Sequence, residues 1–178
     1  LKIINRLNRL YDKMVVESVP ERMSNAKLTL VEKIEKTDEE YIRDWLNQDY
    51  EHATNFPENL KVANSKGIKM RSKSEVLISN ILDEYNIPYI YEKPLRLGGY
   101  KTVLPDFTIL DVRNRREVYL EHLGMMDDVE YFAKNLEKIK AYEENGIYVG
   151  TQLLITYETQ KNPINTKVVR GMIESCFN

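Results

Sequence analysis

The chain has 178 residues, of which 42% are hydrophobic and 30% are charged, and this suits one globular domain with a real core and an appended helical segment. A formal net charge of −2 excludes a globally basic surface, so a nucleic acid would have to meet a local basic patch. The single cysteine, Cys176, excludes an internal disulfide and a cysteine-rich zinc site.

The sequence carries neither a membrane segment nor a secretion signal. Its longest apolar runs, such as 153–155, are far too short to span a bilayer, and residues 1–20 lack the apolar core of a signal peptide. We therefore expect a cytoplasmic protein with no membrane partner. The first residue is leucine, so we also expect further sequence upstream.

The N-terminal part of the chain, residues 1–65, is predicted to be a mainly helical region. Apolar residues at helical spacing predict an amphipathic helix over 1–18, and residues 27–34 favour a short strand. Thr37 and Glu40 form a capping box that begins a second helix.

The main domain, residues 66–178, alternates helices with strands. Its predicted elements are a helix over 72–85, strands over 88–97, 103–110 and 117–123, a helix over 127–144, a strand over 151–157 and a helix over 167–176. Three meandering strands form antiparallel pairs, and the helical crossover returns the fourth strand to the same sheet. We therefore predict an α/β fold, with a mixed β-sheet flanked by helices.

Two acids lie within the apolar strands of the predicted hairpin. Asp106 stands between Pro105 and Phe107, and Glu121 lies on the next strand. An acid in such a strand is costly unless it is paired or holds a cation, and two facing carboxylates suit Mg²⁺ or Mn²⁺. The alternative is that each acid is exposed or bonded to a nearby lysine, and the spacing alone leaves both interpretations open.

Five segments of the sequence occur in an order that resembles a known superfamily. They cover 71–75 with the helix that follows, 91–95, 104–110, 119–124, and 121–128 with Lys138 and Tyr142 downstream. Together they resemble the PD-(D/E)XK nucleases, in particular a bacterial and phage subgroup with an E-H-x-G second motif. The resemblance covers roughly residues 66–160.

The resemblance implies a restriction-endonuclease-like αβββαβ core and metal-dependent phosphodiester hydrolysis. It implies that the metal ligands are Asp106, Glu121 and the backbone carbonyl of His122. The His122 ring should point to the opposite face of the strand, because side chains alternate, and we expect it to be buried and hydrogen-bonded. Glu75 would assist catalysis, although Ser72 and Glu75 also form a capping box.

The sequence departs from the superfamily pattern where the motif lysine belongs, because that position is Leu123. We expect Lys138, or else Lys134, to replace it from the following helix. The buried stripe of that helix is predicted to comprise Val129, Phe132, Leu136 and Ile139, and the adjacent face Tyr131, Lys134, Lys138 and Tyr142. The alternative is a solvated Lys138 whose stem covers apolar surface.

Two basic segments are candidates for binding phosphates near the carboxylates. The first contains Lys69, Arg71 and Lys73, and the second is the hairpin turn with Arg113, Arg115 and Arg116. The alternative is that each segment is a solvated loop.

The sequence thus predicts a nuclease that uses Mg²⁺ or Mn²⁺ and acts on nucleic acid, in first place DNA. Further domains or partner proteins of a repair, helicase or defence system would fit this chemistry. Because Leu123 replaces the motif lysine, the alternative function is an inactive nuclease-fold module that binds nucleic acid or a protein partner.

Overall fold

A computed structural model describes residues 36–50, 60–98 and 101–177. The helix expected over 1–18 and the strand expected over 27–34 lie outside the described residues. The chain divides into two compact units, 1–43 and 44–178. Among the described helices, none is long and apolar enough to cross a membrane.

The predicted capping box at Thr37 is confirmed. The Glu40 amide donates to Thr37 Oγ1, the Thr37 amide donates to Glu40 Oε2, and both distances are 3.2 Å. These reciprocal bonds satisfy two amides at the start of α4 (Asp38–Leu46).

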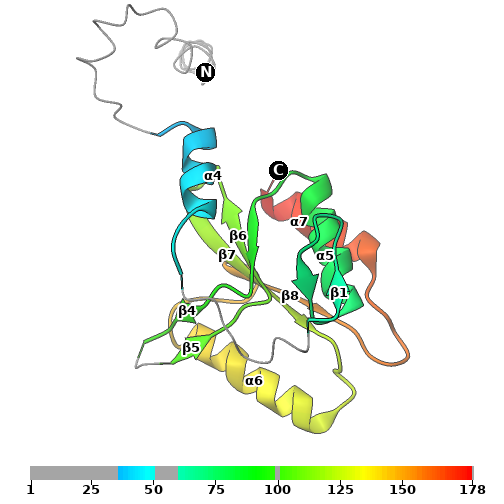
Figure 1. Ribbon diagram of the computed structural model, residues 1–178. Coiled ribbons are helices and arrows are strands. Elements are labelled where there is room, and N and C mark those ends of the chain that lie inside the picture. The colour runs from blue at the N-terminus through cyan, green and yellow to red at the C-terminus, as the bar shows by residue number, and fades with distance from the viewer. Residues whose placement is uncertain (1–35, 51–59, 99–100, 178) are drawn as a thin grey trace, which may run out of the picture. The chain divides into compact units, whose positions relative to one another are not determined.

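The centre of the second unit is a four-stranded sheet with the order β3-β6-β7-β8. Its strands are β3 (Tyr89–Tyr91), β6 (Phe107–Asp111), β7 (Arg116–Leu123) and β8 (Leu153–Tyr157). The pairs β3–β6 and β6–β7 are antiparallel, and β8 returns parallel to β7. The predicted mixed α/β sheet with a crossover helix before its last strand is confirmed (Figure 1).

Two of the predicted strands are shorter in the structure than the sequence suggested. The segment 88–97 breaks at Glu92, whose φ is 48°, and its second half forms a separate hairpin of β4 (Leu95–Arg96) with β5 (Thr102–Val103). The segment 103–110 breaks at Pro105, which lacks the amide hydrogen that a ladder needs. Both breaks lie next to Asp106, so the main chain leaves the sheet where the candidate site begins.

A second small hairpin, β1 (Val62–Ala63) with β2 (Lys69–Met70), precedes the sheet. The boundary that we placed between residues 65 and 66 falls inside this hairpin. Residues 62–63 therefore belong structurally with the residues that follow them.

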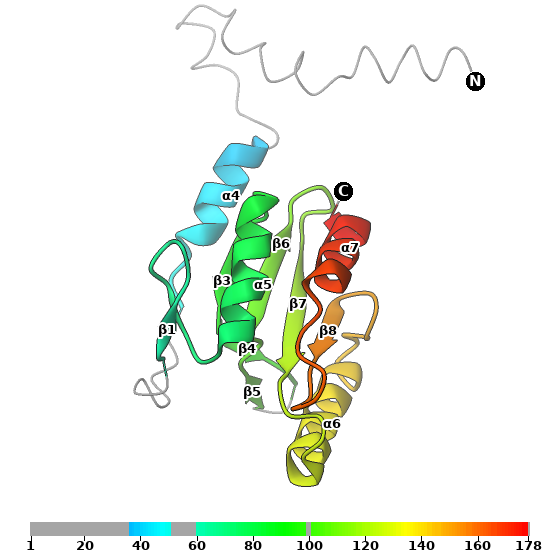
Figure 2. The ribbon, with the colours of Figure 1, turned by 90° about the vertical axis from the view of Figure 1, so that its right-hand side faces the viewer.

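The helices cover the two faces of the sheet unequally (Figures 1 and 2). On one face, α5 (Lys73–Glu84) and α7 (Thr166–Phe177) pack on a core cluster that includes Ile78, Leu82, Phe107, Leu120 and Ile173. On the other face, α6 (Val129–Glu143) contributes Ala141 and Tyr142 to a smaller cluster.

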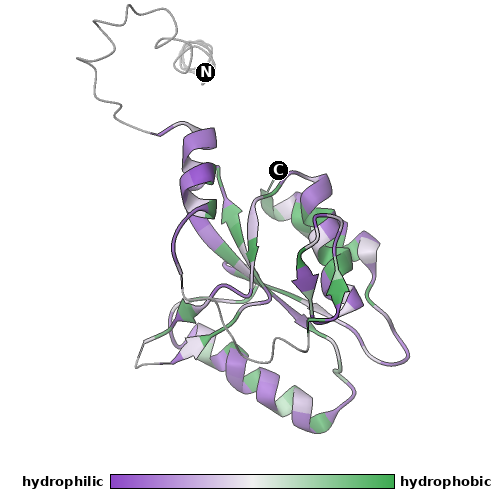
Figure 3. Cartoon of the chain, in the orientation of Figure 1, coloured by the Kyte–Doolittle hydropathy of each residue, from purple (hydrophilic) through white to green (hydrophobic). Residues whose placement is uncertain are grey.

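The predicted buried stripe of α6 is wrong. Val129 is 80% exposed, Phe132 44% and Leu136 54%, and green segments along α6 in Figure 3 mark apolar residues of this helix. The residues of α6 that contact β7 or the adjacent Gly124 are instead polar, namely Tyr131, Lys138 and Tyr142, while Ala141 is buried and Ile139 half-buried. Helical spacing identified two adjacent faces, and the face that reaches the sheet is the one with the tyrosines and Lys138.

Candidate active site

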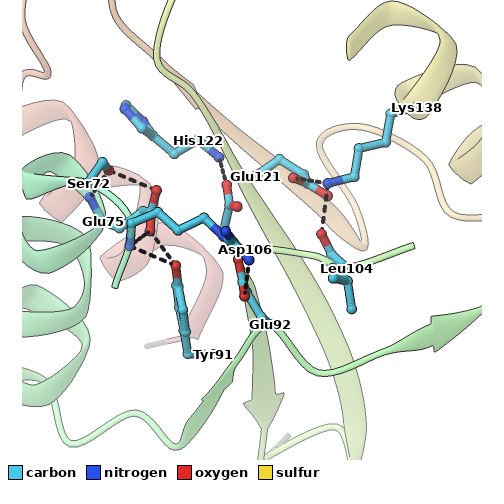
Figure 4. A network of polar contacts seen from close by, with 10 residues as sticks. Ser72, Glu75, Tyr91, Glu92, Leu104, Asp106, Glu121, His122 and Lys138 are labelled. Carbon is cyan, nitrogen blue, oxygen red and sulfur yellow. Dashed lines mark hydrogen bonds and ion pairs between the residues drawn. The ribbon is translucent and has the colours of Figure 1, made fainter. Parts of the chain in front are cut away.

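Asp106 and Glu121 face each other across the β6–β7 ribbon. The ladder pairs Phe107 with Leu120, so its continuation by one residue sets Asp106 opposite Glu121. Residues directly opposite each other on antiparallel strands project to the same face. The predicted meeting of the two acids therefore follows from the register, and their side chains appear together in Figure 4.

The Glu121 carboxylate is almost fully enclosed, with 3% of the residue exposed. Lys138 Nζ lies 2.7 Å from its Oε2, and the Tyr142 hydroxyl donates to its Oε1 over 2.6 Å. Burial raises the pKa of Glu121, while the Lys138 charge acts in the opposite direction. Each oxygen has accepted one hydrogen bond and retains a lone pair for a further partner.

Asp106 is half-buried as a residue, so it is less enclosed than Glu121. Its Oδ2 accepts the His122 backbone N–H at 2.6 Å. Burial by the surrounding protein, followed by the nearby charge of Glu121, holds the pKa of Asp106 well above its usual range. A cation placed between the two acids would remove much of this repulsion.

Lys138 reaches this pair from α6, as Figure 4 shows. Besides its bond to Glu121, Nζ donates to the Leu104 carbonyl at 2.8 Å. Lys134, the other lysine that we considered, is exposed, and Leu123 is buried in the strand. Lys138 is therefore the lysine that the structure brings to the carboxylates.

Glu75 lies in the first turn of α5 and is also buried. Ser72 Oγ accepts the Glu75 amide at 3.1 Å, so the helix-capping interpretation holds. The carboxylate itself accepts the Tyr91 hydroxyl at 2.6 Å and the Arg71 amide at 3.1 Å. Its charge is among those that raise the pKa of Asp106, after burial and Glu121, so Glu75 belongs to the surroundings of the site as well.

The basic residues that we predicted divide into two groups. Arg71 stands before Glu75 and forms a two-pronged ion pair with Glu92, with Nη2 donating to Oε2 at 3.1 Å. Lys69 and Lys73, on either side of Arg71, are exposed. These three residues remain candidates for binding phosphates close to the carboxylates.

The turn with Arg113 and Arg115 lies at the opposite end of the β6–β7 ribbon. Asp111 and Arg116 form the last pair of the ladder, five residues from Asp106, which corresponds to about 17 Å along the strands. Arg116 is also bound to Asp111 at 2.9 Å. The turn therefore does not lie beside the carboxylates, and phosphate binding by its arginines stays a prediction.

His122 turns its ring to the other face of β7. Nδ1 lies 3.0 Å from Thr156 Oγ1. Nε2 lies 3.4 Å from Glu158 Oε1, but the geometry is not that of a hydrogen bond, and the buried Nε2 has no such partner among the described residues. The ring position agrees with strand alternation, and the backbone group that contacts Asp106 is the His122 N–H.

Sequence reasoning did not include Tyr142 and Tyr91 among the site residues. Tyr142 is fully buried and orients Glu121, and Tyr91 orients Glu75. A signal for Tyr142 was present, because a residue four positions after Lys138 lies on the same helical face. No comparable signal marks Tyr91.

The donor set fits a hard divalent cation better than zinc. Within the described ranges, no cluster of three or more histidine, cysteine, aspartate or glutamate residues is arranged to hold a metal. What the site offers is two facing carboxylates, Asp106 on a half-buried residue and Glu121 with a lone pair left on each oxygen. Mg²⁺ commonly uses one or two carboxylates and takes its remaining ligands from water and phosphate.

Comparison with known proteins gives one relative. The chain is 35% identical over 98 residues to Uncharacterized protein MJ1519 of Methanocaldococcus jannaschii. The match covers 53% of this chain and 8% of that protein, so the chain spans only a small part of its relative's length. No protein-family model and no solved structure matches.

Proposed function

We propose that this chain carries a metal-dependent nuclease domain of the PD-(D/E)XK type, with a restriction-endonuclease-like fold, that hydrolyses phosphodiester bonds, in first place in DNA. The observation that carries the proposal is the facing pair Asp106 and Glu121, with Lys138 2.7 Å from Glu121. The order of the helices and strands around this pair supports the same assignment.

Each side chain has a distinct task in this chemistry. Asp106 and Glu121 would hold Mg²⁺ or Mn²⁺, which supplies positive charge against the charge that grows on the phosphate. Lys138 has given two of its three N–H groups to Glu121 and Leu104. Its third N–H can orient the attacking water or stabilise a phosphate oxygen.

The assignment of a nucleic acid as substrate rests on the basic residues near Glu75. Lys69 and Lys73 are exposed and Arg71 lies between them, so all three can meet backbone phosphates. Contacts of this kind are independent of base sequence and weaken as salt rises.

The experiment that tests the proposal measures cleavage of plasmid and single-stranded DNA with Mg²⁺ or Mn²⁺. Wild type should cleave, while Asp106→Ala and Glu121→Ala should lose activity by a factor of about 10³ or more. Glu130→Ala is the matched control, because Glu130 is an exposed acid in the first turn of α6. Activity that survives both site substitutions would overturn the proposal.

The second candidate function is an inactive nuclease fold that binds nucleic acid or a protein partner. The observation that favours it is Leu123, buried where the resemblance places the motif lysine. Calorimetric titration with Mn²⁺ separates the two candidates. An active site should bind Mn²⁺ in a manner that depends on Asp106, whereas an inactive one should show no such binding.

A further inference from the structure

Tyr131 is a partly buried residue in the first turns of α6 that the proposed mechanism does not use. Its hydroxyl oxygen accepts the Gly124 backbone N–H at 3.1 Å. Gly124 follows β7 directly, three residues after Glu121. The bond therefore fixes the phenol over the end of the strand that carries the carboxylate.

Tyr131 and Lys138 lie on the same face of α6. They are seven positions apart in the sequence, which is two helical turns, or about 10 Å along the axis. Lys138 meets Glu121, and Tyr131 meets Gly124, so the helix runs back along the end of β7. The two side chains consequently reach the C-terminal end of β7, at Glu121 and at Gly124, from two positions along one helix.

The Tyr131 hydroxyl still has a proton to donate. Its oxygen accepts the bond from Gly124, and the Asn135 side chain lowers the pKa of the phenol, as a second donor to the same oxygen does. Among the described residues, no hydrogen bond runs from this O–H to an acceptor. A phenol donates one hydrogen bond and also accepts. Burial raises the pKa of Tyr131, and the charges of Asp106 and Glu121 act in the same direction, so the group stays a donor at neutral pH.

The position of Tyr131 beside Asp106 indicates the role of its O–H group. The His122 amide that donates to Asp106 and the Gly124 amide that donates to Tyr131 are two residues apart, which is at most about 7 Å along the chain. A donor near two carboxylates normally bonds to one of them, as Tyr142 and Lys138 do with Glu121. Tyr131 forms no hydrogen bond with either acid, and the charge of each acid raises the pKa of its hydroxyl. Its O–H is thus available for a ligand that occupies the space beside the pair.

We infer that Tyr131 is a substrate-binding residue whose hydroxyl donates a hydrogen bond to a non-bridging oxygen of the phosphodiester at the Asp106–Glu121 pair. This inference rests on the proposed nuclease function and adds a specific phosphate contact to it. Lys138 would act on the same phosphate from the other position on α6. The bond is made to a charged oxygen, and such bonds are stronger than those between neutral groups.

The test uses Tyr131→Phe, which removes one oxygen and keeps the ring. Tyr148→Phe is the matched control, because Tyr148 is an exposed tyrosine in the segment after α6. In anisotropy titrations with a labelled oligonucleotide and no added metal, Tyr131→Phe should bind about tenfold more weakly than wild type. Tyr148→Phe should bind as wild type does.

A second measurement separates direct contact from a structural role, since Tyr131→Phe also leaves the Gly124 amide without its partner. Each non-bridging oxygen of the scissile linkage is replaced in turn by sulfur, a poorer acceptor. In wild type, one of the two diastereomers should be cleaved more slowly for lack of this bond. In Tyr131→Phe that particular sulfur penalty should shrink several-fold, because the bond is already gone.

The outcomes distinguish the inference from the function on which it rests. If wild type neither binds nor cleaves nucleic acid, the proposed function fails and the inference fails with it. If wild type cleaves and Tyr131→Phe binds equally well, or slows oxygen and sulfur substrates by the same factor, the inference alone is overturned. The inference is supported if the slower cleavage of that sulfur diastereomer disappears in Tyr131→Phe and persists in Tyr148→Phe.

Discussion

On one face of the central sheet α5 and α7 close a continuous apolar core, whereas on the other face α6 contributes only Ala141 and Tyr142 as buried residues. The same contrast appears within β7, between two consecutive residues. His122 points to the first face and meets Thr156, and Glu121 points to the second face and meets Lys138.

The contrast indicates that one face of the sheet stabilises the fold, while the other face carries the candidate active site. Enclosing carboxylates is costly, and the raised pKa of Asp106, due to burial first and Glu121 second, records that cost. The apolar core on the α5–α7 face offsets it. Substitutions on the two faces should therefore change different measurements.

After the two carboxylates, the largest effect on activity is expected at Lys138. Lys138→Gln should lower cleavage by a factor of about 10²–10³, because one positioned donor is commonly worth this much. Lys134→Gln is the matched control on the same helix, and its exposed side chain should change the rate less than about threefold. Steady-state cleavage assays compare the two variants. Equal rates for both would contradict the assignment of Lys138.

The matched pair Leu82→Ala and Leu136→Ala compares the two faces in stability. Leu82 is fully buried in the α5–α7 core, while Leu136 on α6 is 54% exposed. Leu82→Ala should lower the free energy of unfolding by about 2–5 kcal/mol, and Leu136→Ala by less than about 0.5 kcal/mol. Denaturant titration measures both. A large loss for Leu136→Ala would show that the outer stripe of α6 is packed in solution.

The sequence predicted the sheet better than it predicted how α6 packs. Strand alternation set the positions of Glu121 and His122 on opposite faces of β7, since a period of two leaves no other arrangement. The stripe of Val129, Phe132 and Leu136 followed the general rule that apolar residues face inward. At α6 this rule fails, because the inner face carries residues that serve the carboxylates.

The candidate site shows a similar division. Asp106 and Glu121 could be predicted to lie on one face, because strand side chains alternate, and the length of the hairpin turn limits the register. The break at Glu92 could not be predicted, since it depends on a positive φ at an ordinary residue. The break at Pro105 could have been predicted from the proline itself. The distance of the Arg113 turn from the acids could have been predicted, because a hairpin turn lies at the end opposite its open strands.

A smaller effect is expected for the stability of Asp106→Asn. The pKa of Asp106 is raised in the folded chain, by burial first and Glu121 second, so the folded state favours the protonated form. The stabilisation is full below the unfolded pKa and is lost as pH rises through the folded one. At neutral pH the variant should therefore melt a few degrees higher than wild type, about 2–4 °C for each kcal/mol.

The same melting experiment contains its own controls. The advantage of Asp106→Asn should shrink as pH falls, because wild type then becomes neutral at this position too. Mn²⁺ should raise the melting temperature of wild type but leave the variant unchanged, since only the folded carboxylate pair binds the ion. A variant that is less stable than wild type at neutral pH would contradict the strained-site interpretation.

The smallest effects should come from removing one hydroxyl on each face. Thr156→Val leaves His122 Nδ1 without its partner and should cost about 1–2 kcal/mol of stability, with Mn²⁺ affinity unchanged. Tyr142→Phe frees Glu121 Oε1 and should weaken Mn²⁺ binding about tenfold, because groups that orient a metal ligand have effects of this size. Calorimetry and denaturant titration on both variants complete the comparison. If Thr156→Val weakened Mn²⁺ binding as much as Tyr142→Phe does, β7 would transmit strain between its faces, and the separation of stability from chemistry would not hold.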